Sequence, residues 1–283
     1  MPPTTDDRLA VSPALRRLLL VAAALVFLAA LQLFVFPLRT ADWFAWTIAP
    51  PMTAVFLGAA YWSSAVLEIA GARAAGWSEA RLAVGSVLVF TTLTLVVTLV
   101  HLDRFHLGAE HPGGARAITW GWLAIYTVVP VALTAVGVRE LARARSWMDP
   151  VPVRELPEGL RALLIVLGVA LIGAGVTLLL VPGTAATLWS WPLTPLTARA
   201  VGAWLVGLGW AAGHAGLVDD VRAVRPVGWT GATFVVLQGV ALARHGGDLD
   251  GGAATVGYVV GLLAVGVAAL WILLLKTDRV PAA

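Results

Sequence analysis

Long uninterrupted apolar segments constrain the fold of this chain more than any other feature. Eight of them follow one another along the 283 residues, and each is about as long as the 20 or so residues that cross the hydrocarbon core of a bilayer. Their expected bounds are 15–36, 51–71, 81–101, 119–139, 160–182, 196–217, 226–245 and 254–276. Because the segments are continuous rather than alternating, they indicate helices and not the strands of a β-barrel. The sequence predicts an all-α polytopic membrane bundle.

Composition supports a membrane protein and excludes several other classes. Charged residues make up only 12% of the chain, and its mean hydropathy is +0.87, whereas soluble domains are about a quarter charged. The isoelectric point near 9.9 does not indicate nucleic-acid binding, because the net charge is only +3 and the basic residues are scattered singly. Cysteine is absent, which excludes disulfides and thiolate chemistry. We therefore expect the lipid bilayer as the partner, and no nucleic acid.

Basic residues predict the orientation of the helices. If the N-terminus is cytoplasmic, fourteen of the 19 Lys and Arg residues lie in inner segments, as the positive-inside rule requires. The outer five are Arg39, Arg104, Arg116, Arg199 and Arg244. Both termini are expected in the cytoplasm of a bacterial cell, with the chain in the plasma (inner) membrane. Six tryptophans at the predicted outer ends are interpreted as an interfacial belt: Trp43, Trp46, Trp120, Trp122, Trp189 and Trp191.

The chain also repeats itself at an offset of 144 residues. The matched pairs are Pro51 with Pro195, Thr53 with Thr197, Ala54 with Ala198, Gly58 with Gly202, Ala59 with Ala203 and His101 with His245, and one gap upstream pairs Pro37 with Pro182 and Trp46 with Trp191. These matches predict two four-helix repeats, at 15–140 and 160–277. A cytoplasmic linker at 141–159 joins them, and cytoplasmic segments at 1–14 and 278–283 flank them. Four spans per repeat give both repeats the same orientation, so the repeat is parallel.

The matched residues predict a shared corner at the outer start of the second helix of each repeat. The prolines suit a first helical turn, the threonines can satisfy free backbone donors there, and the glycines allow a neighbouring helix to approach closely. A purely structural corner is one interpretation. The other is an outer vestibule between the repeats, where two helix N-termini favour an anion. Its candidate ligand-binding residues are Trp46, Thr53, Trp191, Thr197 and Arg199.

Two further ionisable residues lie within predicted spans and are therefore candidate ligand-binding groups. Glu68 is expected roughly 25 Å along its helix from Pro51, where it either pairs with Arg73 or Arg139 or serves a ligand. His214 lies similarly deep, and packing against its neighbours is the alternative. No predicted span carries a charge at its centre, which disfavours an ion-coupled transporter or proton pump.

The outer loop after the third span is rich in groups that can bind metal ions, and its counterpart in the second repeat adds another histidine. The candidate metal ligands are His101, Asp103, His106, Glu110, His111 and His245. Imidazole and carboxylate suit a divalent metal such as zinc. If residues 103–111 were helical, His106 and Glu110 would share one face. A solvated loop, with His101 and His245 capping helix ends, is the alternative, and no cofactor is required.

Glycines spaced four residues apart, at 209 and 213 and again at 257 and 261, indicate close helix contacts. We expect these contacts inside the bundle, with a homo-oligomer or another membrane protein as the alternative partner. Two segments, WSWPLTPLTARAVGAWL at 189–205 and HLDRFH at 101–106, resemble segments of a family of bacterial multi-pass membrane proteins with a WxWPLTPLTAR-type segment. The resemblance implies a fold and no activity.

Three functions remain open from the sequence. The expected one is a non-catalytic membrane protein of structural, assembly or sensory type, which requires no chemistry within the spans. The second is a transporter or channel for small solutes or lipids, with its site between the repeats near the outer face. The third is a metal-dependent membrane enzyme that uses the outer histidines. A cavity between the repeats would favour the second, and converging histidines would favour the third.

Overall fold

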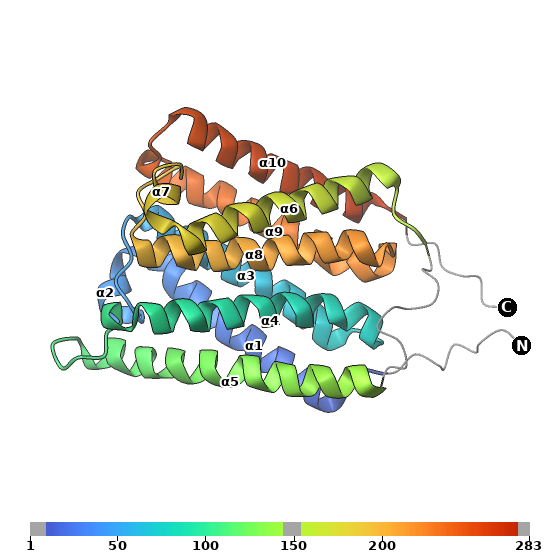
Figure 1. Cartoon of the computed structure of the whole chain (residues 1–283), viewed down its shortest axis with the longest axis horizontal. Helices are drawn as coiled ribbons and strands as arrows, with labels where there is room; N and C mark the ends of the chain where they lie inside the picture. Colours follow the sequence, from blue (N-terminus) through green and yellow to red (C-terminus); the bar gives the residue numbers. More distant parts are fainter. Residues whose placement is uncertain (1–9, 144–153, 277–283) are drawn as a thin grey trace, which may run out of the picture.

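Eight long apolar helices, each able to cross a membrane, make up the described part of the protein (Figure 1). The computed structural model describes residues 10–143 and 154–276. Much of the predicted cytoplasmic segment and linker, and all of the predicted tail, lie outside these residues, as do Arg8, Arg145 and Arg279. Within the described ranges the structure is an all-helical bundle without strands. The predicted fold class and the eight predicted spans are confirmed.

Short helices connect the spans at one end of the bundle. The spans are α1 (Pro13–Ala30) with its π-helical extension η1 (Leu31–Val35), α3 (Pro51–Arg73), α4 (Trp77–Val100), α5 (Gly113–Arg143), α6 (Glu158–Leu180), α8 (Pro195–Val218), α9 (Val221–His245) and α10 (Gly252–Leu274). The short helices are η2 (Pro37–Arg39), α2 (Thr40–Trp43), η3 (Leu102–Arg104), α7 (Pro182–Ala186) and η4 (Gly246–Asp248). The largest difference from the predicted bounds is at α5, which begins at Gly113 rather than 119. Helical backbone extends beyond the apolar run there, because a helix can form in polar as well as apolar sequence.

Local sequence explains where the main helices begin. Pro51 and Pro195 occupy the first turns of α3 and α8, as predicted, because proline needs no hydrogen-bond partner there. The Thr194 hydroxyl accepts a hydrogen bond from the Thr197 amide, and Thr197 in turn caps Thr194, so α8 starts with a capping box. Asp220 caps α9 through the amides of the first turn. The positions of these helices therefore follow from their first residues.

Four central helices, α3, α4, α8 and α9, hold the bundle together. α3 packs against α9, and α4 packs against α8. The outer helices each lie on one of them: α1 on α3, α5 on α4, α6 on α8 and α10 on α9. Figure 1 shows α6 and α10 at one edge and α1 and α5 at the other. The duplication stays a prediction. The packing of α1 on α3 and of α5 on α4 matches that of α6 on α8 and of α10 on α9, as two parallel four-helix repeats require.

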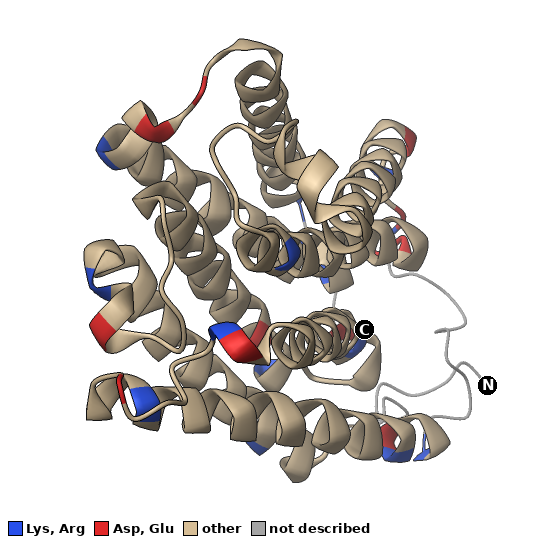
Figure 2. Cartoon of the chain, turned by 60° about the vertical axis from the view of Figure 1, so that its left-hand side comes forward, with Lys and Arg blue, Asp and Glu red and all other residues tan. Residues whose placement is uncertain are grey.

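The bundle has two ends, named here by what they contain. The terminal end is where α1 begins and α10 ends, and there Arg16 donates a hydrogen bond to the carbonyl of Ala74 at the end of α3. The loop end holds the segments 36–50, 101–112, 181–194 and 246–251. Figure 2 shows charged residues mainly on short stretches near helix ends and in connections, with long uncharged stretches between them. The predicted cytoplasmic side corresponds to the terminal end.

The tryptophans at the loop end do not all form an interfacial belt. Trp43 and Trp120 are exposed, at 43% and 61% of their surface, as a belt requires. Trp46, Trp122 and Trp191 are buried, and for these three the prediction of a belt is wrong. They pack inside the bundle because other aromatic rings surround them there. Tryptophan at this end therefore builds the protein core as well as its surface.

Glycines bring α6 and α8 into backbone contact. A Cβ atom added at Gly175 would lie 2.6 Å from the carbonyl oxygen of Gly202, and one added at Gly168 would lie 2.7 Å from the Cα atom of Gly213. At both distances something would have to shift, so only glycine fits. The glycines at 209 and 213 thus pack inside the bundle. Those at 257 and 261 in α10 have no atom within 4 Å of an added Cβ, so they serve no close helix contact in the described structure.

Candidate functional site

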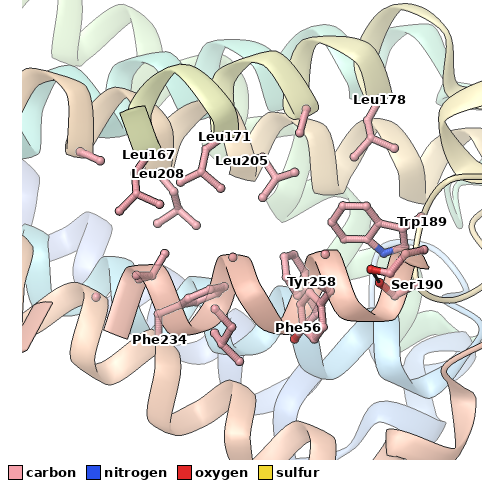
Figure 3. A pocket seen from close by; sticks show the side chains of 18 of the residues that line it. Phe56, Leu167, Leu171, Leu178, Trp189, Ser190, Leu205, Leu208, Phe234 and Tyr258 are labelled. Atoms are coloured by element: carbon pink, nitrogen blue, oxygen red, sulfur yellow. Dashed lines mark hydrogen bonds between the residues drawn. The ribbon is translucent and has the colours of Figure 1, made fainter. Parts of the chain in front are cut away.

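A cavity of about 870 Å³ lies among α6, α8, α9 and α10. α6 packs mainly on α8 and α10 mainly on α9, which leaves space between the two outer helices. Figure 3 shows Leu167, Leu171 and Leu205 on one wall, facing Phe234 and Tyr258 on the other. The volume falls within the range of about 300–1,000 Å³ that is usual for ligand pockets.

The cavity exists because α10 presents small residues to α6. Its lining side carries Ala254, Gly257, Gly261 and Ala268, spaced three, four and seven residues apart along one helix face. A Cβ atom at Gly257 or Gly261 would point into open space, with no atom within 4 Å. Larger side chains at these positions would fill the gap. The stripe of small residues in α10 therefore produces a cavity rather than the close helix contact predicted from its spacing.

Polar groups of the cavity gather at its loop end, where Trp189 and Ser190 lie in Figure 3. The Ser190 hydroxyl donates to the carbonyl of Ala254 at 3.0 Å, and Asp250 lines the cavity beside it. The Trp189 indole N–H is buried without a hydrogen-bond partner in the structure. Among the described residues that line the cavity there is no lysine, arginine or histidine. The site thus has an apolar body and one polar end without a positive charge.

The corresponding region between α3, α4 and α5 is filled. Trp46 packs against Phe44, Phe105 and Trp122, with ring centroids 4.7–5.2 Å apart. A gap of about 10 Å³, roughly the room of one water molecule, lies beside this aromatic cluster. Trp204 reaches in from α8 and also lines the gap. Ring packing therefore leaves no ligand-sized space in this region.

Two of the residues predicted to form a vestibule bind each other, and the others have different partners. The buried Trp191 indole N–H donates to the Thr53 hydroxyl at 2.9 Å, which joins the 181–194 segment to α3. At the start of α3, the Met52 amide donates to the Asp248 carboxylate at 2.9 Å, so a donor that an anion would need already has a partner. Thr197 is engaged in the capping box. None of the seven residues predicted to bind a ligand lines the large cavity.

Arg199 connects the two predicted repeats at the loop end. Its Nε donates to the carbonyl of Leu179 at 3.0 Å, which satisfies the end of α6. Its guanidinium also lies 2.7 Å from Nε2 of His101 at the end of α4. Burial, and then the positive charge of Arg199, lower the pKa of His101. A neutral imidazole whose Nε2 accepts a hydrogen bond from the arginine fits this geometry.

His106, predicted as a metal ligand, is turned into the protein. Its ring nitrogens lie 3.0 Å from the Thr47 hydroxyl and 2.9 Å from the carbonyl oxygen of Phe44, and only 2% of its surface is exposed. Burial lowers the pKa of His106, although the hydrogen bond to Phe44 opposes that shift. Residues 103–111 do not form a continuous helix, so His106 and Glu110 do not share a helix face. The loop packs around this histidine.

The remaining candidate metal ligands are spread over the loop end. Asp103 forms an exposed ion pair with Arg104, and Glu110 lies 3.5 Å from His111. The Nε2 atom of His245, at the end of α9, has no hydrogen-bond partner. In the described residues no three His, Asp or Glu side chains come together to hold a metal ion. The structure thus distributes these residues instead of gathering them around one point.

Glu68 and His214 occupy separate positions in the interior. The Ser64 hydroxyl donates to one carboxyl oxygen of Glu68 at 2.8 Å, and the other oxygen has no partner. Within residues 10–143 and 154–276, neither Arg73 nor Arg139 forms an ion pair with it. His214 is half-buried beside Trp210, and its Nδ1 has no hydrogen-bond partner. The expected pairing of Glu68 with a surface arginine is therefore wrong for the described residues.

Comparison of the chain with protein-family models, curated proteins and solved structures finds no match. The cavity between α6 and α10 is thus the feature from which a function is argued. Sequence reasoning missed its residues because leucine, alanine and glycine are ordinary in a membrane span. The sequence did contain one indication of the cavity. The small residues on one face of α10 run from Ala254 to Ala268, which is longer than a single GxxxG pair.

Proposed function

We propose that the protein binds the hydrocarbon chain of a membrane lipid in the cavity between α6 and α10. The observation that carries the proposal is an apolar cavity of about 870 Å³ within the membrane-spanning part of the bundle. Its body is lined by leucine, alanine, valine and phenylalanine side chains, which match the chemistry of an acyl chain. A polar solute would have to give up its hydration in such a cavity without gaining hydrogen bonds.

The polar end of the cavity supports a lipid with a specific head. Lipid hydrocarbon is as apolar as leucine, so moving a chain from the bilayer into the protein yields little hydrophobic free energy. Preference for one lipid must then come from shape and from the groups at the loop end. Ser190, Asp250 and the unpartnered indole N–H of Trp189 offer hydrogen bonds and one negative charge. These groups favour a head with an amine or hydroxyl, such as phosphatidylethanolamine, over a purely anionic one.

Photo-cross-linking tests this proposal. The full chain is reconstituted in phosphatidylcholine vesicles that contain phosphatidylethanolamine with a diazirine on its acyl chain. Cross-links are expected at cavity residues of α6, α8 and α10 rather than evenly over the lipid-facing surface. The double variant Gly257→Phe and Gly261→Phe fills the open side of α10, where an added Cβ meets no atom within 4 Å. Labelling of the cavity should fall by roughly tenfold, equivalent to about 1.4 kcal/mol of binding free energy.

Gly173→Phe is the matched control. Gly173 lies on α6, has open space around an added Cβ and does not line the cavity. This variant should keep wild-type labelling. Even labelling of all lipid-facing helices, or cavity labelling that the double variant leaves unchanged, would show that the cavity does not hold a lipid chain.

A further inference from the structure

A carboxyl group lies inside the first four spans with only one hydrogen bond. Glu68 of α3 exposes 1% of its surface. Its Oε1 accepts from the Ser64 hydroxyl at 2.8 Å, one helical turn before it, and its Oε2 is buried without a partner. The side chain is therefore enclosed by the bundle rather than directed to the membrane surface.

Opposite charge does not compensate this carboxyl. Among the described residues no Lys, Arg or His forms an ion pair with Glu68. The titratable groups that interact with it are Tyr61 on its own helix and Tyr126 on α5, whose hydroxyls are 2.6 Å apart. Arg81 of α4, which is also buried, acts on His214 of α8. The surroundings of Glu68 are thus neutral.

A second buried glutamate provides the contrast. Glu140 of α5 is 3% exposed, but its Oε1 lies 3.4 Å from the Arg143 guanidinium. An ionised carboxylate in a protein interior is costly unless it is paired and hydrogen-bonded. Glu140 meets that condition through Arg143. Glu68 does not, and a neutral carboxyl is the form that its surroundings accommodate.

We propose that Glu68 is a proton-binding site inside the membrane-spanning bundle, with its proton bound at pH 7. The proton resides on the carboxyl whose second oxygen has no donor, while the Ser64 hydroxyl bonds to the first. The site is separate from the lipid cavity, because Glu68 does not line it. It therefore stands independently of the proposed lipid binding.

The position of Glu68 relates it to the cavity through the predicted duplication. At the offset of 144 residues, Ser64 and Glu68 of α3 correspond to Leu208 and Ala212 of α8. Both counterparts line the cavity. One helix face thus carries an acid and its hydroxyl partner in the first half and apolar cavity-lining residues in the second. Proton binding and lipid binding would then be divided between equivalent faces.

Infrared spectroscopy of the full chain at pH 7, in a detergent without ester groups such as dodecyl maltoside, tests the proposal. A protonated carboxyl has a C=O band at higher frequency than a carboxylate, in a region free of amide absorption. This band is expected in the wild type, lost in Glu68→Gln and retained in Glu140→Gln, which should instead lose carboxylate absorption. Glu68→Asp should retain a protonated band at a shifted frequency and identifies the residue if the glutamine variant folds poorly. A protonated band that persists in Glu68→Gln, or a wild type without one, would overturn the proposal.

Discussion

The two predicted halves of the bundle differ most where their structures should correspond. Between α6 and α10 there is a cavity of about 870 Å³, whereas the matching region of the first half retains a gap of about 10 Å³. In the first half Trp122 and Tyr126 of α5 project large rings inward. In the second half the facing positions of α10 are mainly alanine and glycine. The residues of the outer helix therefore contribute strongly to whether such a four-helix unit is filled or contains a cavity.

A central helix contributes to the same difference. Trp204 of α8 stacks on Phe90 of α4 with ring centroids 3.8 Å apart and contacts Tyr61 edge-on at 4.8 Å. At the predicted offset its counterpart in α3 is Ala60, which sends no ring toward the second half. Trp204 of the second half therefore fills space in the first half. From α3 of the first half, Phe56 is the side chain that lines the cavity of the second half.

Removal of Trp204 should have the largest effect on stability. Trp204→Ala would create a void in the filled half, with an expected loss of about 3–5 kcal/mol in the free energy of unfolding. Leu208→Ala is the comparison, because Leu208 already borders open space and loses fewer contacts. Denaturant unfolding in detergent measures both. Equal losses for the two variants would mean that the halves do not differ in packing.

An intermediate effect is expected at the tryptophans matched by the duplication. Trp191→Phe removes the hydrogen bond to Thr53 and leaves a buried hydroxyl without its donor, which should cost about 1 kcal/mol beyond the change in ring size. Trp46→Phe removes an indole N–H that has no partner, so its cost should be smaller. The same unfolding measurement compares them. A larger loss for Trp46→Phe would contradict the hydrogen-bond assignment.

The smallest expected effect is a pH dependence of stability that involves His101. The pKa of His101 in the folded protein is lowered from 6.5 by burial and by Arg199. The unfolded chain then binds more protons than the folded one, so stability is complete above pH 6.5 and falls as the pH drops below it. His101→Gln should weaken this loss, while His106, whose pKa is also lowered, retains part of it. A loss of stability at low pH that His101→Gln leaves unchanged would contradict the role of burial and of Arg199 at this histidine.

The number of spans and the starts of α3 and α8 could be predicted from the sequence. Continuous apolar runs have one solution in a bilayer, and Pro51 and Pro195 mark first turns because of what proline lacks. The close approach at Gly58 could also be predicted, since a Cβ atom there would lie 2.7 Å from the backbone nitrogen of Phe34. These features depend on local chemistry alone.

The cavity and the partners of polar residues could not be predicted in the same way. Trp191 and Thr53 are far apart in the chain, and only packing brings them to 2.9 Å. Glu68 was expected near surface arginines because its depth along the helix was known but its rotational position was not. Gly257 and Gly261 have the spacing of a contact motif, yet whether a partner helix occupies that face depends on how α6 sits on α8.

The place of α10 in the chain has a consequence for biosynthesis. α10 is the last of the eight spans in the described residues and forms part of one wall of the cavity. Chains fold from the N-terminus during synthesis, so the seven earlier spans can assemble around α3, α4, α8 and α9 before this wall exists. Until α10 is inserted, the cavity is an open groove that faces bilayer lipid. Its first occupant can then enter from this open side while the protein is still being made.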